Sequence, residues 1–457
     1  MITIVEPKGY IVKLWGNQPI KKDSVYRLMR YVIRTEYEGT VLLHNTVTGH
    51  LVALERNESS VLERLPLSFN PVIEQLILNH FLVPVQYDEH HQVQKLRRIL
   101  QTLEDVQSTK SILHYTILPT TACNARCYYC FEQGVETSTM SEQTATDVIE
   151  YISSHCGNEK TIVITWFGGE PTIATNRIDQ ICEGLQKNNI KYRSKMYTNG
   201  YLLDLDMIKK AKELWHLIGV QICVDGTENS YNRIKAYIST TDNPYQRVMR
   251  NLGLLLDQGI TVGLRMNFDL GNYQEFSSIV DEVENRFGHN ELLYVSAHPV
   301  IGEYEDHDGN VMHADDDWFS TKVVELNCLS RDKGFRQSKS GLPFLNGDAC
   351  SASHGTSITI RPDGGISRCA ELFGNDDLVG TIQSDIIHYE RDCSWKLVAD
   401  YNMCVECVFY PFCVRLVNCP NNTYCHKKLS YEGHYREVIK KVYSTQKSAN
   451  KKEDFLC

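Results

Sequence analysis

Long apolar runs are missing from this chain of 457 residues, which contains no stretch of about 18 consecutive apolar residues. A membrane-spanning helix is therefore not expected. The first residues also lack a basic segment followed by an apolar core and a cleavage site, so no secretory signal is expected and the predicted location is cytoplasmic. Basic residues are in the minority, with 47 Lys and Arg against 57 Asp and Glu and a net charge of −10. Since nucleic-acid binding generally needs a basic face, we expect neither a nucleic-acid nor a membrane partner.

Cysteine is absent from the first 105 residues. β-branched and aromatic runs predict short strands at residues 31–34, 41–45 and 51–54, with a glycine-containing hairpin loop between the last two. Helical patterns follow at residues 58–65, 71–79 and 88–105, with Asn70 as a predicted N-cap. Strands followed by helices predict a small α+β unit over residues 1–105.

Strand and helix patterns alternate over residues 106–335. The predicted strands span residues 112–118, 161–167, 191–197, 219–224, 261–266 and 292–297. The predicted helices span residues 142–155, 178–187, 205–217, 245–257, 273–286 and 316–329. The strands are rich in β-branched and aromatic residues and are expected to be buried on both faces. Six successive βα units predict the α/β class, with a parallel sheet closed into a partial barrel that carries its functional residues at the carboxyl ends of the strands.

Sixteen cysteines are many for a chain expected in a reducing compartment, where disulfides are disfavoured. Nine of them fall in residues 336–457, where regular periodicity fades and turn residues increase. A cysteine-rich segment of this kind is expected to need metal for its stability. We therefore predict a third, metal-dependent unit over residues 336–457.

The first cysteine group, Cys123, Cys127 and Cys130, directly follows the first predicted barrel strand. Three thiolates at this spacing can hold a cubane iron–sulfur cluster, which normally takes four ligands, so one iron would stay open. The alternatives are a zinc knuckle or three buried thiols. Zinc would need a fourth ligand, and none lies close in sequence.

With Phe131 after it, this cysteine group resembles the signature of the radical S-adenosylmethionine (radical SAM) superfamily. The resemblance implies a 4Fe–4S cluster whose open iron binds S-adenosylmethionine and whose electron cleaves it to a radical. Further motifs end the next strands. Gly168, Gly169, Glu170 and Pro171 are similar to the GGEP motif of the family, and Asn199, Asp225 and Arg265 follow on later strands. The resemblance implies that these seven residues bind the cofactor; a plain strand-end turn and an ordinary ion pair of Arg265 are the alternatives.

The C-terminal cysteines resemble the SPASM extension, which holds two auxiliary 4Fe–4S clusters, so that three clusters are expected in all. The resemblance implies that Cys350, Cys369 and Cys419 hold the first auxiliary cluster, and that Cys404, Cys407, Cys413 and Cys425 hold the second. One departure from the family pattern is Val417, which stands where a cysteine is usual, so the role passes to Cys419. Cys328 is a candidate fourth ligand of the first auxiliary cluster; an open or substrate-filled iron is the preferred expectation. Zinc ribbons are the alternative.

Residues 41–54, with the short helical patterns after them, are similar to the winged-helix-like precursor-recognition element of ribosomal peptide maturases. In that family the element grips a leader peptide, which adds to an exposed strand edge. The expected partners are a precursor peptide and an electron donor such as flavodoxin or ferredoxin.

The resemblance as a whole implies a maturase of the sactipeptide or ranthipeptide type, which installs a crosslink through a 5′-deoxyadenosyl radical. A thioether is the first choice and a carbon–carbon or ether cyclophane is the alternative. A sulfatase-maturase-like enzyme is disfavoured because Ala370 and Glu371, not an aspartate, follow Cys369. Glu371 is the candidate catalytic base, with a solvated carboxylate as the alternative. A non-catalytic electron relay or peptide-binding protein is disfavoured by the motif at residues 168–171, since a relay needs no cofactor site.

Overall fold

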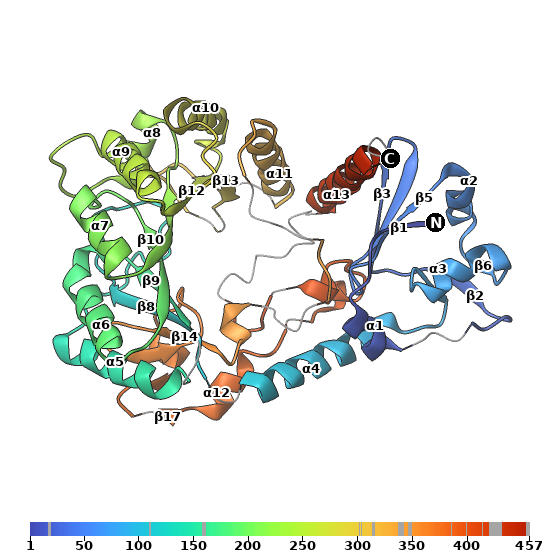
Figure 1. Ribbon diagram of the computed structural model, residues 1–457, viewed down its shortest axis with the longest axis horizontal. Coiled ribbons are helices and arrows are strands. Elements are labelled where there is room, and N and C mark those ends of the chain that lie inside the picture. Colours follow the sequence, from blue (N-terminus) through green and yellow to red (C-terminus); the bar gives the residue numbers. More distant parts are fainter. Residues whose placement is uncertain are drawn as a thin grey trace.

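A computed structural model describes residues 1–16, 20–108, 111–157, 161–300, 302, 304–312, 316–336, 342–345, 350–384, 386–398, 400–413, 415–419 and 432–453. Figure 1 shows a curved layer of helices and strands, a smaller N-terminal unit on the opposite side, and cysteine-rich segments between them. Within the described residues, no helix is long and apolar enough to cross a membrane.

The large unit is built on a ten-stranded sheet with the order β13-β12-β11-β10-β9-β8-β14-β15-β16-β17. Its first six strands in the chain pair in parallel: β8 (His114–Thr120), β9 (Ile162–Gly168), β10 (Tyr192–Thr198), β11 (Leu217–Cys223), β12 (Thr261–Phe268) and β13 (Leu293–Pro299). The predicted parallel sheet and the α/β class are confirmed.

Helices cover the convex side of this sheet (Figure 1). They are α5 (Glu142–His155), α6 (Thr175–Lys187), α7 (Leu205–Glu213), α8 (Glu228–Lys235), α9 (Pro244–Asp257), α10 (Phe276–Phe287) and α11 (Asp316–Asp332). Side-chain caps fix several starts, because Ser141 Oγ accepts from the Thr144 amide at 3.0 Å before α5, and the Asn243 side chain caps α9. Helix α8 was not predicted, because its sequence is largely polar.

The expectation that the barrel strands are buried on both faces is wrong. Alternate residues of β10, such as Ser194 and Met196, are buried beneath the helices, whereas Arg193, Lys195 and Tyr197 are exposed. Helices cover only one side of the sheet, and its other side faces inward as the wall of an open partial barrel. Half of each strand is therefore free to carry polar and charged side chains.

The cysteine-rich part extends the same sheet, which the sequence did not predict. Strand β14 (Ser357–Ile360) pairs in parallel with β8, and β15 (Gly365–Ser367), β16 (Leu378–Thr381) and β17 (Ile386–Ile387) continue antiparallel from it. Helix α12 (Tyr389–Ser394) follows. Since Cys369 comes two residues after β15, a cysteine predicted to hold an auxiliary cluster is joined to the barrel by continuous pairing.

The N-terminal unit has two antiparallel sheets, of order β1-β5-β4-β3 and β6-β2-β7. Its strands are β1 (Ile2–Val5), β2 (Val25–Leu28), β3 (Val32–Tyr37), β4 (Thr40–Asn45), β5 (Leu51–Leu54), β6 (Leu67–Ser68) and β7 (Leu82–Pro84). Its helices are α1 (Gly9–Trp15), α2 (Arg56–Ser59), α3 (Glu74–Leu78) and α4 (Glu89–Ser108). The predicted strands correspond to β3, β4 and β5, and helices follow them as expected, but β1, α1 and β2 come before them, and β6 and β7 lie between the helices.

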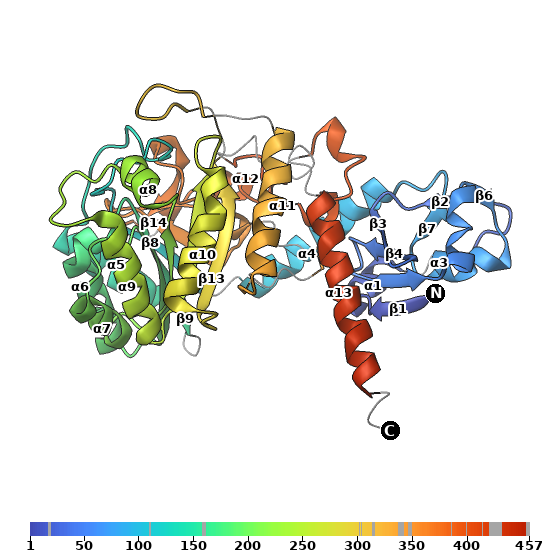
Figure 2. The same ribbon diagram turned by 90° about the horizontal axis from the view of Figure 1, so that it is seen from above.

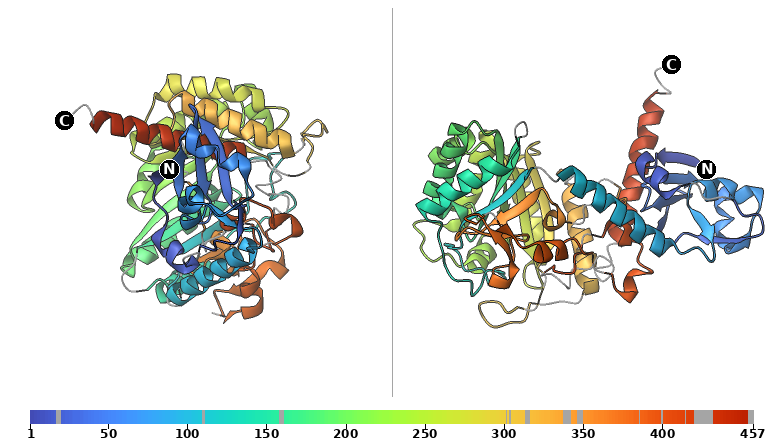
Figure 3. Two further views of the ribbon diagram at one scale, coloured as in Figure 1. Left: turned by 90° about the vertical axis from the view of Figure 1, so that its right-hand side faces the viewer. Right: turned by 90° about the horizontal axis from the view of Figure 1, so that it is seen from below.

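Two helices join the N-terminal unit to the rest of the chain. Helix α13 (Glu432–Glu453) packs on β3 and also contacts α11, and Figure 2 shows it between the two units. Helix α4 runs from the N-terminal unit toward the cysteine-rich part, as the two views of Figure 3 show. The N-terminal core accordingly includes Cys407, Phe409 and Tyr410 from the C-terminal part.

Candidate functional site

The first cysteine group lies in the loop of residues 121–141, which follows β8 at the carboxyl edge of the sheet and is called the cluster loop below. Burial raises the pKa of Cys123 to about 11 and that of Cys127 to about 12, and it also raises the pKa of Cys130. The charge of the Cys130 thiolate raises the pKa of Cys123 and of Cys127 further, so the three thiols lie close together in one partly buried place. Iron would reverse the effect, because a metal-bound thiol loses its proton. These thiols fit a 4Fe–4S cluster.

Gly168, the last residue of β9, and Gly169 after it pack closely against the end of β8 and the start of the cluster loop. A Cβ on Gly168, whose φ is +110°, would lie 2.3 Å from the Thr120 carbonyl oxygen. A Cβ on Gly169 would lie 2.4 Å from the Ala122 carbonyl oxygen. The amide of Glu170 also donates to that Ala122 carbonyl at 2.8 Å. Only glycine permits this close approach, so the motif at residues 168–171 fixes where the loop leaves the sheet.

Glu170 is fully buried, and its carboxylate is occupied by neighbouring donors. It accepts from the Thr172 amide at 3.1 Å, from Thr198 Oγ1 at 2.7 Å and from the Asn199 amide at 2.7 Å. Burial raises its pKa, and these hydrogen bonds oppose that shift. Pro171 starts the short 3-10 helix that follows. Glu170 thus ties the ends of β9 and β10 together, and a direct role of Glu170 toward a cofactor ammonium stays a prediction.

Asn199 reaches the cluster loop from the end of β10. Its Nδ2 donates to Asn124 Oδ1 at 2.7 Å, and the Asn124 carbonyl accepts from the Ile238 amide at 2.9 Å. The amide of Arg126 donates to the Lys235 carbonyl at 2.8 Å. The backbone between the cysteines is therefore held from two sides, by β10 and by the C-terminal end of α8.

A buried cation, which was not predicted from the sequence, packs against this loop. Lys235 is 3% exposed, and its Nζ is 2.6 Å from Asp225 Oδ2 and 3.0 Å from the Tyr129 hydroxyl. Asp225, itself fully buried, also accepts from the Asn267 amide at 2.8 Å. Burial opposes the charge of Lys235, but Asp225 and the Cys127 thiolate hold its pKa well above the usual range. A permanent positive charge therefore lies beside the cluster loop, where it favours thiolate over thiol.

Arg265 lies within β12, on the inner side of the strand, and not after its end. Its Nε donates to Asn267 Oδ1 at 2.7 Å. Burial lowers the pKa of His298, on the adjacent strand β13, to about 4, and the charge of Arg265 contributes. Within the described residues Arg265 forms no ion pair with a carboxylate.

The predicted ligands of the first auxiliary cluster come together from distant parts of the chain. Burial raises the pKa of Cys369 to about 12, and Glu371, Cys350 and Cys419 add to that shift through their charges. These three thiols and the Glu371 carboxylate therefore lie near one another. Cys328 lies on α11, where it interacts with Arg331, so its role as a fourth ligand stays a prediction.

The second predicted auxiliary set lies against α4. Arg97 is buried, and its Nη2 donates to the Cys413 carbonyl at 2.6 Å. Burial lowers the pKa of Arg97, while the thiolates of Cys413 and Cys404 oppose that shift. Cys407 is buried in the N-terminal core, and Cys425 lies outside the described residues. Within the described ranges, no three His, Cys, Asp or Glu side chains gather as ligands of a single metal ion.

A row of aromatic rings runs from the cluster loop to the segment after Cys369. Phe131 stacks on Phe167 of β9 with ring centroids 6.2 Å apart, and on Phe373 at 6.4 Å. Phe167 meets Tyr197 of β10 edge to face at 5.3 Å. This aromatic row connects the first cysteine group with the segment that carries Cys369, and it provides apolar surface at the carboxyl edge of the barrel.

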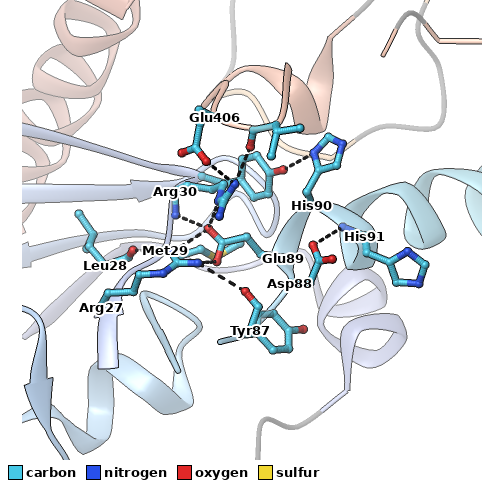
Figure 4. Close-up of polar contacts among 12 residues, drawn as sticks. Arg27, Leu28, Met29, Arg30, Tyr87, Asp88, Glu89, His90, His91 and Glu406 are labelled. Atoms are coloured by element: carbon cyan, nitrogen blue, oxygen red, sulfur yellow. Dashed lines mark hydrogen bonds and ion pairs between the residues drawn. The ribbon is translucent and has the colours of Figure 1, made fainter. Parts of the chain in front are cut away.

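The N-terminal unit is fastened to the second auxiliary segment by a buried carboxylate (Figure 4). Glu89, the first residue of α4, is fully buried and accepts from the Arg30 amide at 2.7 Å and from Arg27 and Arg30 side chains. Arg30 then donates to the Val405 carbonyl at 2.9 Å and pairs with Glu406 at 2.8 Å. This ion-pair cluster joins β2, the start of α4 and the backbone beside Cys404.

Comparison with known proteins agrees with this geometry. Residues 117–283 match the family model of the radical SAM superfamily, and this range includes the cluster loop and the motif at residues 168–171. The chain is 27% identical over 165 residues to the Fe-coproporphyrin III synthase of Methanosarcina barkeri. That alignment covers 36% of this chain and only 39% of the synthase.

Two longer similarities extend beyond the barrel. The chain is 20% identical over 453 residues to the radical SAM cyclopropyl synthase TigE of Paramaledivibacter caminithermalis, covering 90% of each. The solved structure of anSMEcpe with bound AdoMet and Cp18Cys peptide superposes with a TM-score of 0.56 at 16% identity, over 74% of this chain and 99% of that one. This likeness shows a shared fold. Residues 117–283 of this chain are a radical SAM domain.

Proposed function

We propose that this protein is a radical SAM maturase that installs a crosslink in a ribosomally made precursor peptide. The observation that carries the proposal is the aromatic row, which joins the first cysteine group to the segment of Cys369. A substrate side chain at this place lies between a radical source and a second redox-active group. The similarity to a cyclopropyl synthase over 90% of both chains supports the proposal, as does the shared fold with anSMEcpe, which binds a peptide in its solved structure.

The cofactors supply the radical chemistry, and the chain positions and shields them. Cys123, Cys127 and Cys130 would hold the first 4Fe–4S cluster, which, with S-adenosylmethionine bound, generates a 5′-deoxyadenosyl radical. The buried cation of Lys235 stabilises the thiolate ligands by its charge. Phe131, with the rest of the aromatic row, offers apolar surface at the place where a carbon radical would form.

The cysteines of the C-terminal part would hold two auxiliary 4Fe–4S clusters, with the ligand sets given by the resemblance. These groups would supply an acceptor for the electron that remains when the crosslink closes. In the balanced reaction the peptide loses two hydrogens: one as an atom to the 5′-deoxyadenosyl radical, and the other as a proton together with one electron. Glu371, near Cys369, is the proposed base for that proton.

Two bonds are compatible with this reaction. A thioether, our first choice, would form if a substrate thiolate ligates an open iron of the first auxiliary cluster. A carbon–carbon bond is the second candidate, and the similarity to a cyclopropyl synthase over nearly the full length favours it. We further propose that residues 1–105 bind the leader of the precursor and that a flavodoxin or ferredoxin supplies electrons.

Detection of 5′-deoxyadenosine tests the proposal. The anaerobically reconstituted full chain, with reductant and S-adenosylmethionine, is expected to release it, and a C123A/C127A/C130A variant is expected to release none. The precursor encoded beside the gene should lose two hydrogens by mass spectrometry. Alkylation of the product then separates the bonds, because a thioether consumes a peptide thiol. Absence of 5′-deoxyadenosine with and without precursor would refute a radical enzyme.

A further inference from the structure

The inner face of the barrel sheet carries positive charge without acidic residues. Its inward positions, which alternate with residues buried under the helices, are His114, Thr116, Val163, Thr165, Phe167, Arg193, Lys195, Tyr197, Gly219, Gln221, Cys223, Gly263, Arg265, Asn267, Tyr294, Ser296 and His298. None of these is Asp or Glu, although the chain as a whole has a net charge of −10. The charge of this face is therefore opposite to that of the protein.

Electrostatic contacts show that these side chains share one space. Burial lowers the pKa of His114 on β8, and the charges of His354 and then of Lys195 on β10 lower it further, although β9 lies between the two strands. Two strands farther on, Arg265 acts on His298 in the same way. The positive charge of this face therefore comes from Arg193, Lys195 and Arg265, and it favours the neutral form of both histidines.

The residues beside Lys195 on the two adjacent strands are small. They are Thr165 on β9 and Gly219 on β11. Lys195 and Arg193 are exposed, and within the described residues neither forms an ion pair with a carboxylate. Two long cations thus stand among small neighbours with their charges unneutralised.

The charged positions lie next to the aromatic row, toward the amino ends of the strands. Tyr197 follows Lys195 by two residues on the same face of β10, which places them about 6.5 Å apart along the strand. Phe167 stands at the corresponding end of β9, where it contacts Tyr197. The inner face therefore offers apolar surface next to the cluster loop and cations deeper in the barrel.

We propose that this inner face binds an acidic segment of the core peptide, with Asp or Glu side chains paired to Lys195 and Arg193 while an adjacent apolar side chain packs on Phe167 and Tyr197. The inference rests on the proposed peptide maturase and names its substrate class. Charge-assisted hydrogen bonds to carboxylates are strong where side chains are partly removed from water, and complementary charge selects the partner. The apolar residue held beside the cluster loop is then the one that loses hydrogen.

Peptide binding to the anaerobically reconstituted full chain tests this. The probes are three fluorescein-labelled synthetic peptides of Gly-Glu-Phe, Gly-Gln-Phe and Gly-Lys-Phe repeats, followed by fluorescence anisotropy at low salt. The Glu peptide is expected to bind about tenfold more tightly than the Gln peptide. Lys195→Gln should weaken this preference, and Arg193→Gln combined with Lys195→Gln should abolish it. Lys209→Gln, an exposed change on α7, is the matched control and should leave the preference intact.

Three results would overturn the inference. The Glu and Gln peptides could bind equally, or the Lys209 variant could lose the preference for the Glu peptide as much as the Lys195 variant does. The third is a Lys195 variant that keeps the preference while the electron paramagnetic resonance of the reduced clusters changes. In the last case Lys195 would serve a cluster and not the substrate. The readout is separate from catalysis. A protein that releases 5′-deoxyadenosine but shows no acidic preference refutes this inference alone, and one with the preference but no 5′-deoxyadenosine refutes the proposed function.

Discussion

At the scale of single residues, the site depends on charges that are buried in pairs. Lys235 and Asp225 have side chains 4% and 0% exposed, and together they hold Tyr129 of the cluster loop. A lysine at the end of a polar helix normally lies in water, and nothing in the local sequence marks this one as buried. Its position follows from where α8 ends, which depends on tertiary packing.

Removal of this cation should destabilise the protein strongly. Lys235→Met leaves the Asp225 carboxylate buried without its ion pair, which typically costs about 3–5 kcal/mol. We expect that loss in denaturant unfolding of the apo-protein, while Lys212→Met, at an exposed lysine of α7, should change stability little. Adding Asp225→Asn to Lys235→Met removes the unpaired charge and should recover part of the stability. A double variant no more stable than the single one would contradict this account.

At the scale of elements, the start of α4 is held by an ion-pair cluster with one buried and one exposed carboxylate. Glu89→Gln should lower the free energy of opening of α4 by about 3–5 kcal/mol, because Arg27 and Arg30 lose a buried counter-charge. Glu406→Gln, whose side chain is 68% exposed, should cost less than about 1 kcal/mol. Native-state hydrogen exchange of the α4 amides measures both. Similar effects of the two variants would show that Glu89 does not carry the contact.

The strands of the N-terminal unit should lose stability in mild acid. His44, His50 and His80 are buried there, and burial lowers the pKa of each to about 4. The unfolded chain binds a proton near pH 6.5, which the folded chain resists down to about pH 4. Each histidine therefore contributes stability above pH 6.5 that is lost as pH falls toward 4, by up to about 1.4 kcal/mol per pH unit.

Hydrogen exchange of β3, β4 and β5 between pH 7 and 5 checks this, after correction for the intrinsic exchange rate. His44→Gln, which can still donate to the Pro343 carbonyl, should reduce the pH slope by one proton. An unchanged slope in that variant would mean that His44 does not titrate on unfolding.

The helices and strands also show how much of the fold could be predicted from the sequence. Helix α5 was predicted with its observed bounds, because its apolar period and its Ser141 cap are both local signals. The inner face of β10 was not predicted, since the branched and aromatic strands of a covered sheet and of an open barrel look alike. Strands β14 to β17 were missed for a different reason: they are short, and β14, on which the other three build in turn, pairs with β8, which lies more than 230 residues earlier. Motif spacing located Cys123 to Cys130, but Lys195 and Lys235 acquire their roles only from the assembled sheet.

At the scale of the whole molecule, each of the three cysteine groups is held by a different part of the fold. The first lies in the cluster loop of the barrel, the second continues from β15, and the third is enclosed by α4 and the N-terminal core. Continuous strand pairing joins the first two, whereas side-chain contacts of Arg97 and Arg30 hold the third. Each cysteine group should therefore bind or lose its cluster independently of the other two.

The iron content of cysteine variants tests that independence. The reconstituted chain should hold about twelve irons, four in each cubane. C369S/C419S should hold about eight, because only the first auxiliary cluster loses its ligands, and C123A/C127A/C130A should also hold about eight. The C369S/C419S variant should still cleave S-adenosylmethionine to 5′-deoxyadenosine but leave the precursor uncrosslinked, if the first auxiliary cluster is the acceptor of the surplus electron. About four irons in the unmodified chain would remove both auxiliary clusters from the proposal, and a crosslinked product from the C369S/C419S variant would show that the electron leaves by another route.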